Sequence, residues 1–381
     1  MPFSALSLYI HFPFCAGKCR YCDFYSVRYT EAAADAFLAA VAREWELVRD
    51  AYRLGGTRIT TLYCGGGTPS ILTSAQWRRF CAWVRGTLTL ATDVEWSVEC
   101  NPESFDDEKA HVWLDAGVNR LSLGVQTLDE RLLRLLGRPH DARKTLAVLD
   151  NQILRRFGSI GADIIYGIPG QSVRSLAETI NRLLGRGVLD HLSAYELSVH
   201  DATPFGRHRR LLGMADENIA ADMMALVRDM AAAAGFAQYE VSNFARPGRR
   251  CRHNMAYWDL APYIGLGPAA HSYIHPQRFA NVSSLNDYVQ AIGSGRRPLA
   301  FTEQCTPESI AAEMLFLRLR TIDGLDEERF AAACGMPFQT AGRRAVLQQF
   351  IDAGLLEYRR PLWMPTVRGL GMADAMARRL V

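Results

Sequence analysis

The sequence predicts an α/β fold: a partial barrel of six βα units followed by a C-terminal helical, winged-helix-like domain. Short apolar, β-branched runs alternate with amphipathic helical stretches as far as residue 240. Glycines and polar residues follow the ends of the predicted strands. Strands that alternate with helices pair in parallel through right-handed crossovers. Because six units are fewer than the eight of a closed barrel, we expect the barrel to be open on one side.

The predicted strands are short and the predicted helices are long. The strands are 6–11, 57–64, 94–99, 119–125, 160–166 and 191–198. The helices are 32–54, 73–88, 106–116, two within 129–157, 172–184 and 216–234. Gly117 provides a helix stop. Arg138 and the proline after it predict the break between the paired helices.

Composition divides the chain into three parts. Residues 1–240 form the partial barrel, 241–300 a connecting region rich in Gly, Pro and Arg, and 301–381 the C-terminal domain. In the last part, helices over 307–319, 326–333 and 337–353 precede a short strand at 362–366. Winged-helix modules often bind nucleic acid, but a net charge of only +3 favours a packing role here.

The overall composition is that of an ordinary globular protein. Of the 381 residues, 49% are hydrophobic and 22% are charged. No apolar run is long enough to span a membrane, and the N-terminus lacks the features of a signal peptide. We therefore expect a cytoplasmic protein with free thiols and without a nucleic-acid partner.

A cysteine triplet directly follows the first predicted strand. Cys15, Cys19 and Cys22 have the spacing C-x3-C-x2-C, so all three can reach one small metal body. A [4Fe–4S] cluster usually takes four cysteines, and three would leave one iron open to a small molecule. The odd total of nine cysteines argues against a disulfide framework. A zinc site with His11 as fourth ligand remains an alternative.

Polar or glycine-rich segments occupy the other strand ends. YCGGGTPS follows the second strand, where glycines allow close backbone approach and can turn N–H groups toward a ligand. Glu99 ends the third strand, Gln126 the fourth, Arg138 lies in the following loop, and Asp163 is in the fifth strand. Since the chemistry of such barrels sits at the carboxyl ends of the strands, this set predicts a site for a polar cofactor.

The cysteine loop and the strand ends together resemble the radical S-adenosylmethionine (SAM) superfamily. In that superfamily the open iron takes the amino and carboxylate groups of SAM. The cluster then passes an electron to the sulfonium and releases a 5′-deoxyadenosyl radical. The resemblance thus implies that this chain carries a [4Fe–4S] cluster and SAM.

A longer set of motifs resembles the oxygen-independent coproporphyrinogen III oxidase family and, within it, the HemW heme chaperones. The motifs are LYIHFPFCAGKCRYCDF, YCGGGTPS, VECNP, NRLSLGVQT, LGRPH, ADIIYGIPGQ, YEVSNFARPG, CRHNMAYW and YIGLGPAAHS. They cover nearly the whole chain in order. By resemblance the cluster ligands are Cys15, Cys19 and Cys22. The matching SAM-contacting positions are Tyr9, Tyr21, Gly66, Gly67, Thr68, Glu99, Gln126, Arg138 and Asp163. The family's heme-linked histidine corresponds to His253.

Two departures from the true oxidases favour the chaperone branch. Phe24 stands where those enzymes carry a fourth cysteine, and only a few residues precede the first strand. The resemblance then implies heme as cargo, a recipient apo-hemoprotein and an electron donor for the cluster, with peripheral contact to membrane hemoproteins but no membrane span. Coproporphyrinogen III oxidation and methyl transfer to a heme-like substrate remain alternative functions. We also expect Phe24 to pack beside the cluster as an apolar cover.

An arginine run precedes His253. The run contains Arg246, Arg249, Arg250 and Arg252. Arginine pairs bidentately with carboxylates, and heme carries two propionates. We predict a heme site in which the run binds the propionates and His253 binds the iron. Cys251 and His271 are further candidate ligands.

Overall fold

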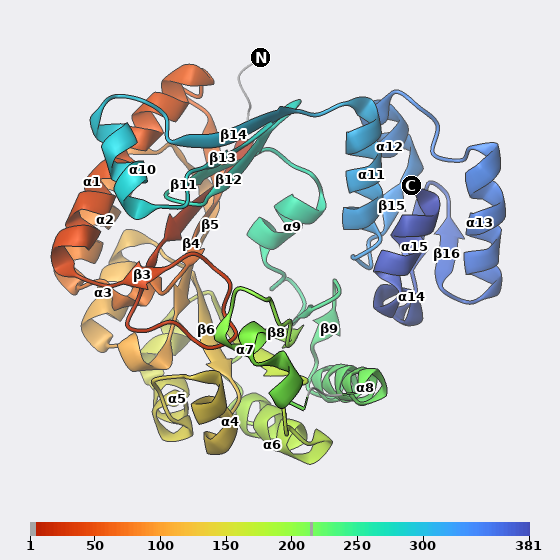
Figure 1. The fold of residues 1–381 in the computed structure, drawn as a ribbon, viewed down its shortest axis with the longest axis horizontal. Coiled ribbons are helices and arrows are strands. Elements are labelled where there is room, and N and C mark those ends of the chain that lie inside the picture. The colour runs from red at the N-terminus through yellow and green to blue at the C-terminus, as the bar shows by residue number, and fades with distance from the viewer. Residues whose placement is uncertain (1–4, 214–215) are drawn as a thin grey trace.

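The computed structural model describes residues 5–213 and 216–381, so residues 1–4 and 214–215 of the predicted barrel lie outside the described residues. A twelve-stranded sheet, in the order β14-β13-β12-β11-β1-β4-β5-β6-β7-β8-β10-β9, forms the centre of the molecule (Figure 1). The predicted strands are β1 (Ala5–Phe12), β4 (Arg58–Gly66), β5 (Leu90–Cys100), β6 (Arg120–Gln126), β7 (Ser159–Tyr166) and β8 (His191–Glu196). They pair in parallel in chain order, which confirms the βα barrel.

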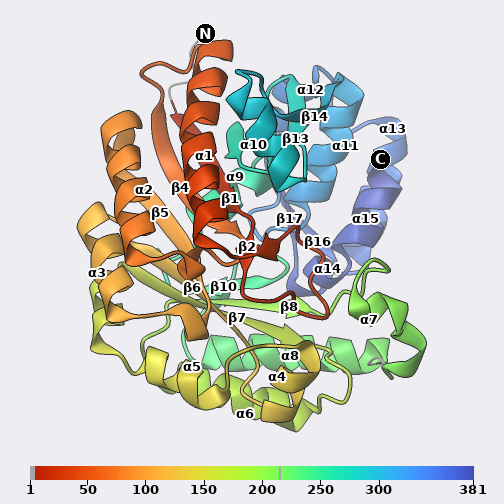
Figure 2. The same cartoon turned by 60° about the vertical axis from the view of Figure 1, so that its left-hand side comes forward.

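Helices cover the outer face of this sheet (Figure 2). They are α1 (Glu31–Ala51), α2 (Ser74–Thr87), α3 (Asp107–Ala116), α4 (Glu130–Leu136), α5 (Ala142–Leu149), α6 (Val173–Leu184) and α8 (Glu217–Ala233). The short α7 (Pro204–Arg207) lies instead against the cysteine loop, where the Phe205 N–H donates to the Arg20 carbonyl at 2.9 Å. The Thr73 side chain forms a capping box at the start of α2. Gly117 ends α3 in the left-handed conformation, as predicted, and Gly137 ends α4 in the same way just before Arg138.

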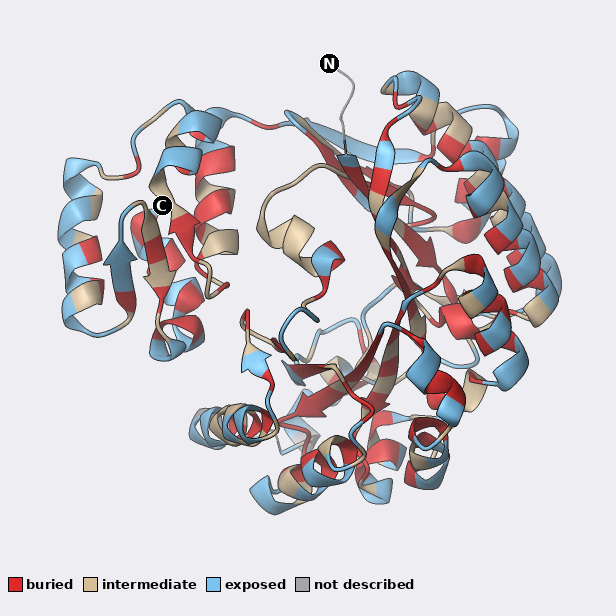
Figure 3. Cartoon of the chain, turned by 180° about the vertical axis from the view of Figure 1, so that it is seen from behind, coloured by how far each residue is buried: buried red, intermediate tan, exposed pale blue. Residues whose placement is uncertain are grey.

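The core lies between the sheet and these helices. The strands are mostly buried (Figure 3), as expected for parallel strands covered by helices. Phe12 at the end of β1 stacks on Trp77 of α2 with ring centroids 5.6 Å apart, and Trp77 meets Trp113 of α3 edge-on. This packing anchors the end of β1, from which the cysteine loop departs. Two short parallel strands, β2 (Phe14–Cys15) and β3 (Val27–Arg28), then join the two ends of that loop.

The predicted connecting region contributes several strands to the sheet. It contains β10 (Asn243–Ala245), α9 (Arg252–Trp258), β11 (Tyr263–Leu266), β12 (His271–Ile274), β13 (Gln277–Asn281), α10 (Leu285–Gly293) and the start of β14 (Leu299–Gln304). The strand β11 pairs in parallel with β1, and β12, β13 and β14 continue antiparallel. On the other edge, β10 and β9 (Ala237–Gln238) follow β8. These strands are short and are separated by glycine and proline, so they show no clear hydrophobic alternation in the sequence.

The C-terminal part has its own small core. The three predicted helices are α11 (Pro307–Arg318), α12 (Glu327–Cys334) and α13 (Ala341–Asp352). The predicted strand is β17 (Leu362–Pro365), which lies between β15 (Leu325–Asp326) and β16 (Leu356–Arg359). Two helices, α14 (Val367–Gly371) and α15 (Ala373–Leu380), end the chain. Helices followed by a small antiparallel sheet agree with the predicted winged-helix-like arrangement.

Ion pairs and backbone bonds attach this C-terminal part to the barrel. The guanidinium of Arg318 on α11 pairs with Asp259 after α9. The Ile322 N–H donates to the Tyr239 carbonyl at 3.1 Å.

Among the helices of the described ranges, none is both long and apolar enough to cross a bilayer.

Candidate functional site

A cavity of ≈ 450 Å³ lies at the carboxyl ends of the barrel strands. We call it the strand-end cavity. It brings together eleven of the thirteen residues singled out from the sequence. They are Cys15, Cys19, Cys22, Tyr21, Gly66, Gly67, Thr68, Glu99, Gln126, Arg138 and Asp163. The predicted convergence of the strand ends on one site is therefore present in the structure.

The three cysteines are free, partly exposed thiols on one loop. Backbone bonds hold that loop, because the Arg20 N–H donates to the Leu136 carbonyl at 3.0 Å. The Thr68 hydroxyl donates to Sγ of Cys15 at 3.6 Å, and the Arg138 guanidinium to Sγ of Cys19 at 3.5 Å. Hydrogen-bond donors therefore point at two of the three sulfur atoms that would bind an iron–sulfur cluster. The residues present thus fit a three-cysteine cluster.

The zinc alternative is wrong, because His11 is not available as a fourth ligand. Its Nδ1 shares a hydrogen bond with the Tyr9 hydroxyl at 3.0 Å, and its Nε2 with the Tyr25 carbonyl at 3.0 Å. Thiolates on a single zinc ion would lie about 4 Å apart. Among residues 5–213 and 216–381, no group of three or more His, Cys, Asp or Glu is arranged to hold one metal ion.

Two partly buried carboxyl groups line the cavity, Glu99 on β5 and Asp163 on β7, with β6 between these strands. Glu99 accepts hydrogen bonds from the Tyr63 hydroxyl at 2.9 Å and the Gly66 N–H at 3.0 Å. Burial, with a smaller contribution from Asp163, raises the pKa of Glu99 to about 7. Burial also raises the pKa of Asp163, although the Ser122 hydroxyl donates to it at 3.0 Å. These carboxyl groups provide acceptors for ammonium or hydroxyl groups of a cofactor.

The last residue of β6, Gln126, and Arg138 on the loop after α4 both line the cavity. Gln126 has a φ of 65°, in the left-handed region that non-glycine residues rarely adopt, beside a register shift between β6 and β7. The Arg138 guanidinium donates to Asn101 Oδ1 at 2.6 Å and to the Gly124 carbonyl at 2.9 Å. Its Nε is buried and has no hydrogen-bond partner in the described part of the chain. A buried donor without a partner is the kind of group that a bound ligand satisfies.

The glycine loop does not present its N–H groups to a ligand, contrary to expectation. The Gly66 N–H donates to Glu99, the Gly67 N–H to the Phe12 carbonyl at 2.8 Å, and the Thr68 N–H to the Phe14 carbonyl at 2.7 Å. Gly66 has a φ of 105°, and a Cβ there would lie 2.5 Å from the His11 ring. Glycine is needed for packing against the end of β1. These three N–H groups are therefore not available to a ligand.

Tyr9 and His253 are the two predicted site residues that do not line the strand-end cavity. His253 is only 1% exposed. Hydrogen bonds join its Nδ1 to the Thr61 hydroxyl at 2.7 Å and its Nε2 to the Tyr257 hydroxyl at 2.9 Å. The ring stacks on Tyr63, with centroids 5.0 Å apart. In this arrangement neither ring nitrogen faces an open space.

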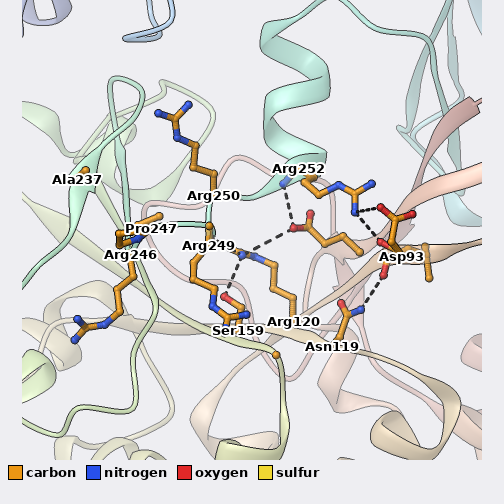
Figure 4. Close-up of a pocket in the computed structure, with 15 residues that line it drawn as sticks. Asp93, Asn119, Arg120, Ser159, Ala237, Arg246, Pro247, Arg249, Arg250 and Arg252 are labelled. Atoms are coloured by element: carbon orange, nitrogen blue, oxygen red, sulfur yellow. Dashed lines mark hydrogen bonds and ion pairs between the residues drawn. The ribbon is translucent and has the colours of Figure 1, made fainter.

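The arginine run lines a different cavity, of ≈ 620 Å³, at the amino ends of β5, β6 and β7. The members of the run that line it are Arg246, Arg249, Arg250 and Arg252. Figure 4 shows these side chains spreading apart: Arg252 reaches Asp93, while Arg250 points away from that pair. The Arg250 guanidinium donates to both carboxylate oxygens of Asp323. The predicted single site, with propionates on the run and iron on His253, is therefore not assembled.

A third cavity, of ≈ 650 Å³, adjoins the strand-end cavity, and we call it the aromatic cavity. Its aromatic walls are Tyr9, Phe24, Tyr25, Tyr257, Tyr263 and Tyr273. Asp23 and Phe24 line both cavities. Phe24 is 62% exposed, so it does not pack as a cover over the cysteines as expected. Sequence reasoning did not find this cavity, because its walls come from β1, the cysteine loop, α9 to β13 and α11, and have no common period.

Comparison with known proteins places this geometry in a family. Residues 9–183 match the family model of the radical SAM superfamily, and residues 305–370 match that of the HemN C-terminal domain. The heme chaperone HemW of Mycobacterium tuberculosis is 37% identical over 388 residues, which cover 100% of this chain and 96% of the relative. This chain belongs to the HemW family of radical SAM proteins. That of Bacillus subtilis is 34% identical over 92% of both chains.

Other relatives extend the HemW family assignment. The mitochondrial radical S-adenosyl methionine domain-containing protein 1 of Bos taurus is 34% identical over 85% of this chain and 75% of its own length. A solved structure of Escherichia coli coproporphyrinogen III oxidase (HemN), described as a radical SAM enzyme, superimposes with a TM-score of 0.86. It covers 100% of this chain and 91% of HemN at 23% identity, and so confirms the fold.

Membership of the radical SAM superfamily implies a [4Fe–4S] cluster and SAM as cofactors of this HemW-family chain. When bound, the cluster supplies an electron for cleaving SAM. The residues of the strand-end cavity fit both groups, with three thiols on one side and Glu99, Arg138 and Asp163 on the other. Which of these residues touches SAM remains a prediction.

Proposed function

We propose that this protein is a heme chaperone: it binds heme and passes it to a recipient hemoprotein, and it carries a [4Fe–4S] cluster and SAM. The observation that supports the proposal most directly is the adjacency of two cavities. The aromatic cavity is of a size and composition that suit a flat macrocycle, and it shares Asp23 and Phe24 with the cavity that holds the three cysteines. Full-length relatives named heme chaperone HemW support the same function.

The assignment of individual residues belongs to the proposal. We assign the cluster to Cys15, Cys19 and Cys22, and SAM to the polar groups of the strand-end cavity, with Tyr21 at the adenine. Tyr9 lines the aromatic cavity, close to the ring of Tyr63, and its proposed contact with the SAM sulfonium end would require that end to reach β1. His253 is proposed as a heme-linked residue, and it can reach heme only if α9 moves.

The setting of this activity is likewise proposed. All nine cysteines are free, which suits a reducing compartment such as the cytoplasm. The recipients include membrane hemoproteins, which the chaperone meets at the membrane surface without a span of its own. A cellular reductant supplies the electron for the cluster. Nucleic acid is not a partner in this proposal.

Heme transfer provides the test. The protein is reconstituted anaerobically with iron and sulfide, loaded with one equivalent of heme, and mixed with a b-type apo-cytochrome. We expect the cytochrome spectrum to appear faster than it does from the same concentration of free heme. Apomyoglobin serves as a non-selective heme acceptor. Equal rates from loaded protein and free heme would contradict the chaperone function.

The two alternatives have their own readouts. Coproporphyrinogen III supplied with SAM and dithionite gives vinyl groups if the chain is an oxidase. Heme supplied with SAM gives a methylated product if it is a methyltransferase. We expect neither product, because the proposed function is transfer of intact heme.

A further inference from the structure

We propose that heme binds in the aromatic cavity with His271 as the axial ligand of its iron. The inference rests on the proposed heme-chaperone function and assigns it a site different from the one predicted around His253. His271 begins β12, on the strands that extend the sheet beyond β1. It is exposed and lines the cavity.

The hydrogen bonds of the histidine ring nitrogens distinguish His271 from the other histidines. Eight of the nine histidines in the sequence engage a ring nitrogen with a protein group. Those that lie near the two cavities are His11, His191, His200 and His253. None of the hydrogen bonds among residues 5–213 and 216–381 involves a ring nitrogen of His271. It is therefore the histidine whose ring is ready to bind iron without losing another partner.

The protonation state of His271 suits this role. Iron binds the neutral imidazole, because the lone pair of a ring nitrogen forms the bond. Partial burial, and to a smaller extent the positive charge of Arg278, lower the pKa of His271. Arg278, on β13, faces the same cavity and pairs with Glu303 and Glu313, so its charge is held in place.

Aromatic side chains form much of the wall around His271. Tyr257 and Tyr263 meet edge-on at 4.6 Å, and Tyr273 extends the aromatic surface along β12. The Phe301 ring on β14 lies edge-on to the imidazole, with centroids 5.9 Å apart, and is 42% exposed. Aromatic side chains that line a cavity and remain partly exposed, as Tyr257 and Tyr263 do, provide a surface for a large apolar ligand. Charged propionates prefer water, so we place them at the mouth of the cavity and the macrocycle inside.

Phe24 gains a role from this arrangement. It is a large apolar side chain that is 62% exposed, and it forms part of the wall between the two cavities. A macrocycle in the aromatic cavity would cover it. Because Cys22 lies two residues before Phe24 on the same loop, heme in the aromatic cavity would contact the loop that carries a cluster ligand. The heme site and the cluster site would thus communicate through residues 22–24.

The test compares two histidine variants of the full-length, cluster-loaded protein by heme titration. We expect His271→Ala to shift the Soret band and to weaken heme binding on the order of tenfold to a hundredfold, the loss seen when a metal site is disturbed. Millimolar imidazole added to this variant should restore the wild-type spectrum, because the free ligand can occupy the space left by the ring. His111→Ala, at another exposed histidine on α3, is the matched control and should bind heme like the wild type.

The outcomes separate the inference from the proposed function. If the wild type binds no heme, the proposed function fails. If the wild type binds heme and His271→Ala binds it with the same spectrum and affinity, only the assignment of His271 is overturned. In that case Thr61→Val, which removes the hydrogen bond to Nδ1 of His253 and lines neither cavity, should change the spectrum if His253 is the ligand. Iron and sulfide content and far-ultraviolet circular dichroism establish that each variant is folded and loaded.

Discussion

The Arg138 guanidinium donates a hydrogen bond to Sγ of Cys19 across 3.5 Å, and it does so from the loop that follows α4. The same guanidinium also binds Asn101 after β5 and the Gly124 carbonyl on β6. One side chain therefore ties the cysteine loop to two strand ends. Its positive charge lies where the cluster would accept an electron.

Replacing Arg138 should lower the reduction potential of the cluster. The reduced cluster carries more negative charge than the oxidised one, and a nearby cation stabilises it. We expect Arg138→Met to move the potential to more negative values, measured by a redox titration followed by electron paramagnetic resonance. Arg138→Lys keeps the charge and should lie closer to the wild type. An unchanged potential in the Met variant would mean that the guanidinium does not act on the cluster.

Removal of one cluster ligand should abolish the cluster without unfolding the barrel. Cys19 lies on a partly exposed loop outside the buried core, so Cys19→Ala should keep the wild-type circular dichroism spectrum. It should fail to retain four irons after anaerobic reconstitution, because two thiolates cannot hold a cubane. The buried Cys81 on α2 provides the control, and Cys81→Ala should keep the cluster. A full iron content in Cys19→Ala would refute the ligand assignment.

Gln126 is expected to lower the folding stability of the protein and to increase its affinity for SAM. Its φ of 65° is strained for a non-glycine residue, at a cost of about 1–2 kcal/mol. Gln126→Gly should therefore raise the melting temperature while weakening SAM binding, since the amide that enters the strand-end cavity is lost. Gln126→Asn tolerates the backbone and keeps an amide, so it should bind SAM more tightly than the Gly variant. Calorimetry measures both quantities, and unchanged SAM affinity in Gln126→Gly would exclude a SAM contact.

Glu240 should make stability fall as the pH rises. The residue is fully buried, and burial raises its pKa to about 7 from the usual 4.5. When the pKa of a carboxyl group is higher in the folded than in the unfolded state, the group does not lower the free energy of unfolding below pH 4.5, because it is protonated in both states. Between pH 4.5 and 7 the unfolded chain loses the proton first, so the free energy of unfolding decreases, by up to about 3 kcal/mol.

Glu240→Gln should remove this dependence. One carboxyl oxygen of Glu240 accepts from the Ser242 N–H at 3.1 Å, and the other is buried without a partner among the described residues. An amide keeps the first bond and carries no charge. We expect the variant to gain more stability over the wild type at pH 8 than at pH 5.5 in urea unfolding. An equal difference at both pH values would show that Glu240 does not titrate in this range.

Phe24 should matter for heme and little for folding. Because its side chain is 62% exposed, Phe24→Ala should change the free energy of unfolding by less than about 0.5 kcal/mol. The variant should retain the cluster but bind heme more weakly, since part of the wall of the aromatic cavity is removed. Val367→Ala on α14 is the matched control. The Val367 side chain is 51% exposed and lines neither cavity. Wild-type heme affinity in Phe24→Ala would separate Phe24 from the heme site.

Local patterns in the sequence determined the parts of this protein that depend on near neighbours. The apolar spacing predicted the six parallel strands and their helices, since strand and helix periods are read within single segments. The cysteine spacing predicted one metal-binding loop. The rule that parallel strands carry chemistry at their carboxyl ends then placed Glu99, Gln126, Arg138 and Asp163 around it, and the structure brings them into one cavity.

Tertiary packing decided what depends on partners far away in the chain. The strand β11 forms by pairing with the edge of β1, and β12 to β14 extend the sheet from it. No short-range pattern in the sequence predicts these strands. The Gly67 and Thr68 N–H groups donate to backbone carbonyls at and just after the end of β1. The glycine-rich loop, predicted to donate hydrogen bonds to a ligand, therefore packs against β1 instead. The same holds for the histidines. Sequence motifs pointed to His253, but the fold turns its ring to Thr61 and Tyr257, whereas the His271 ring lines a cavity and has no hydrogen-bond partner within 5–213 and 216–381. Whether a side chain faces a ligand depends on which groups the fold places opposite it, and that information is not local.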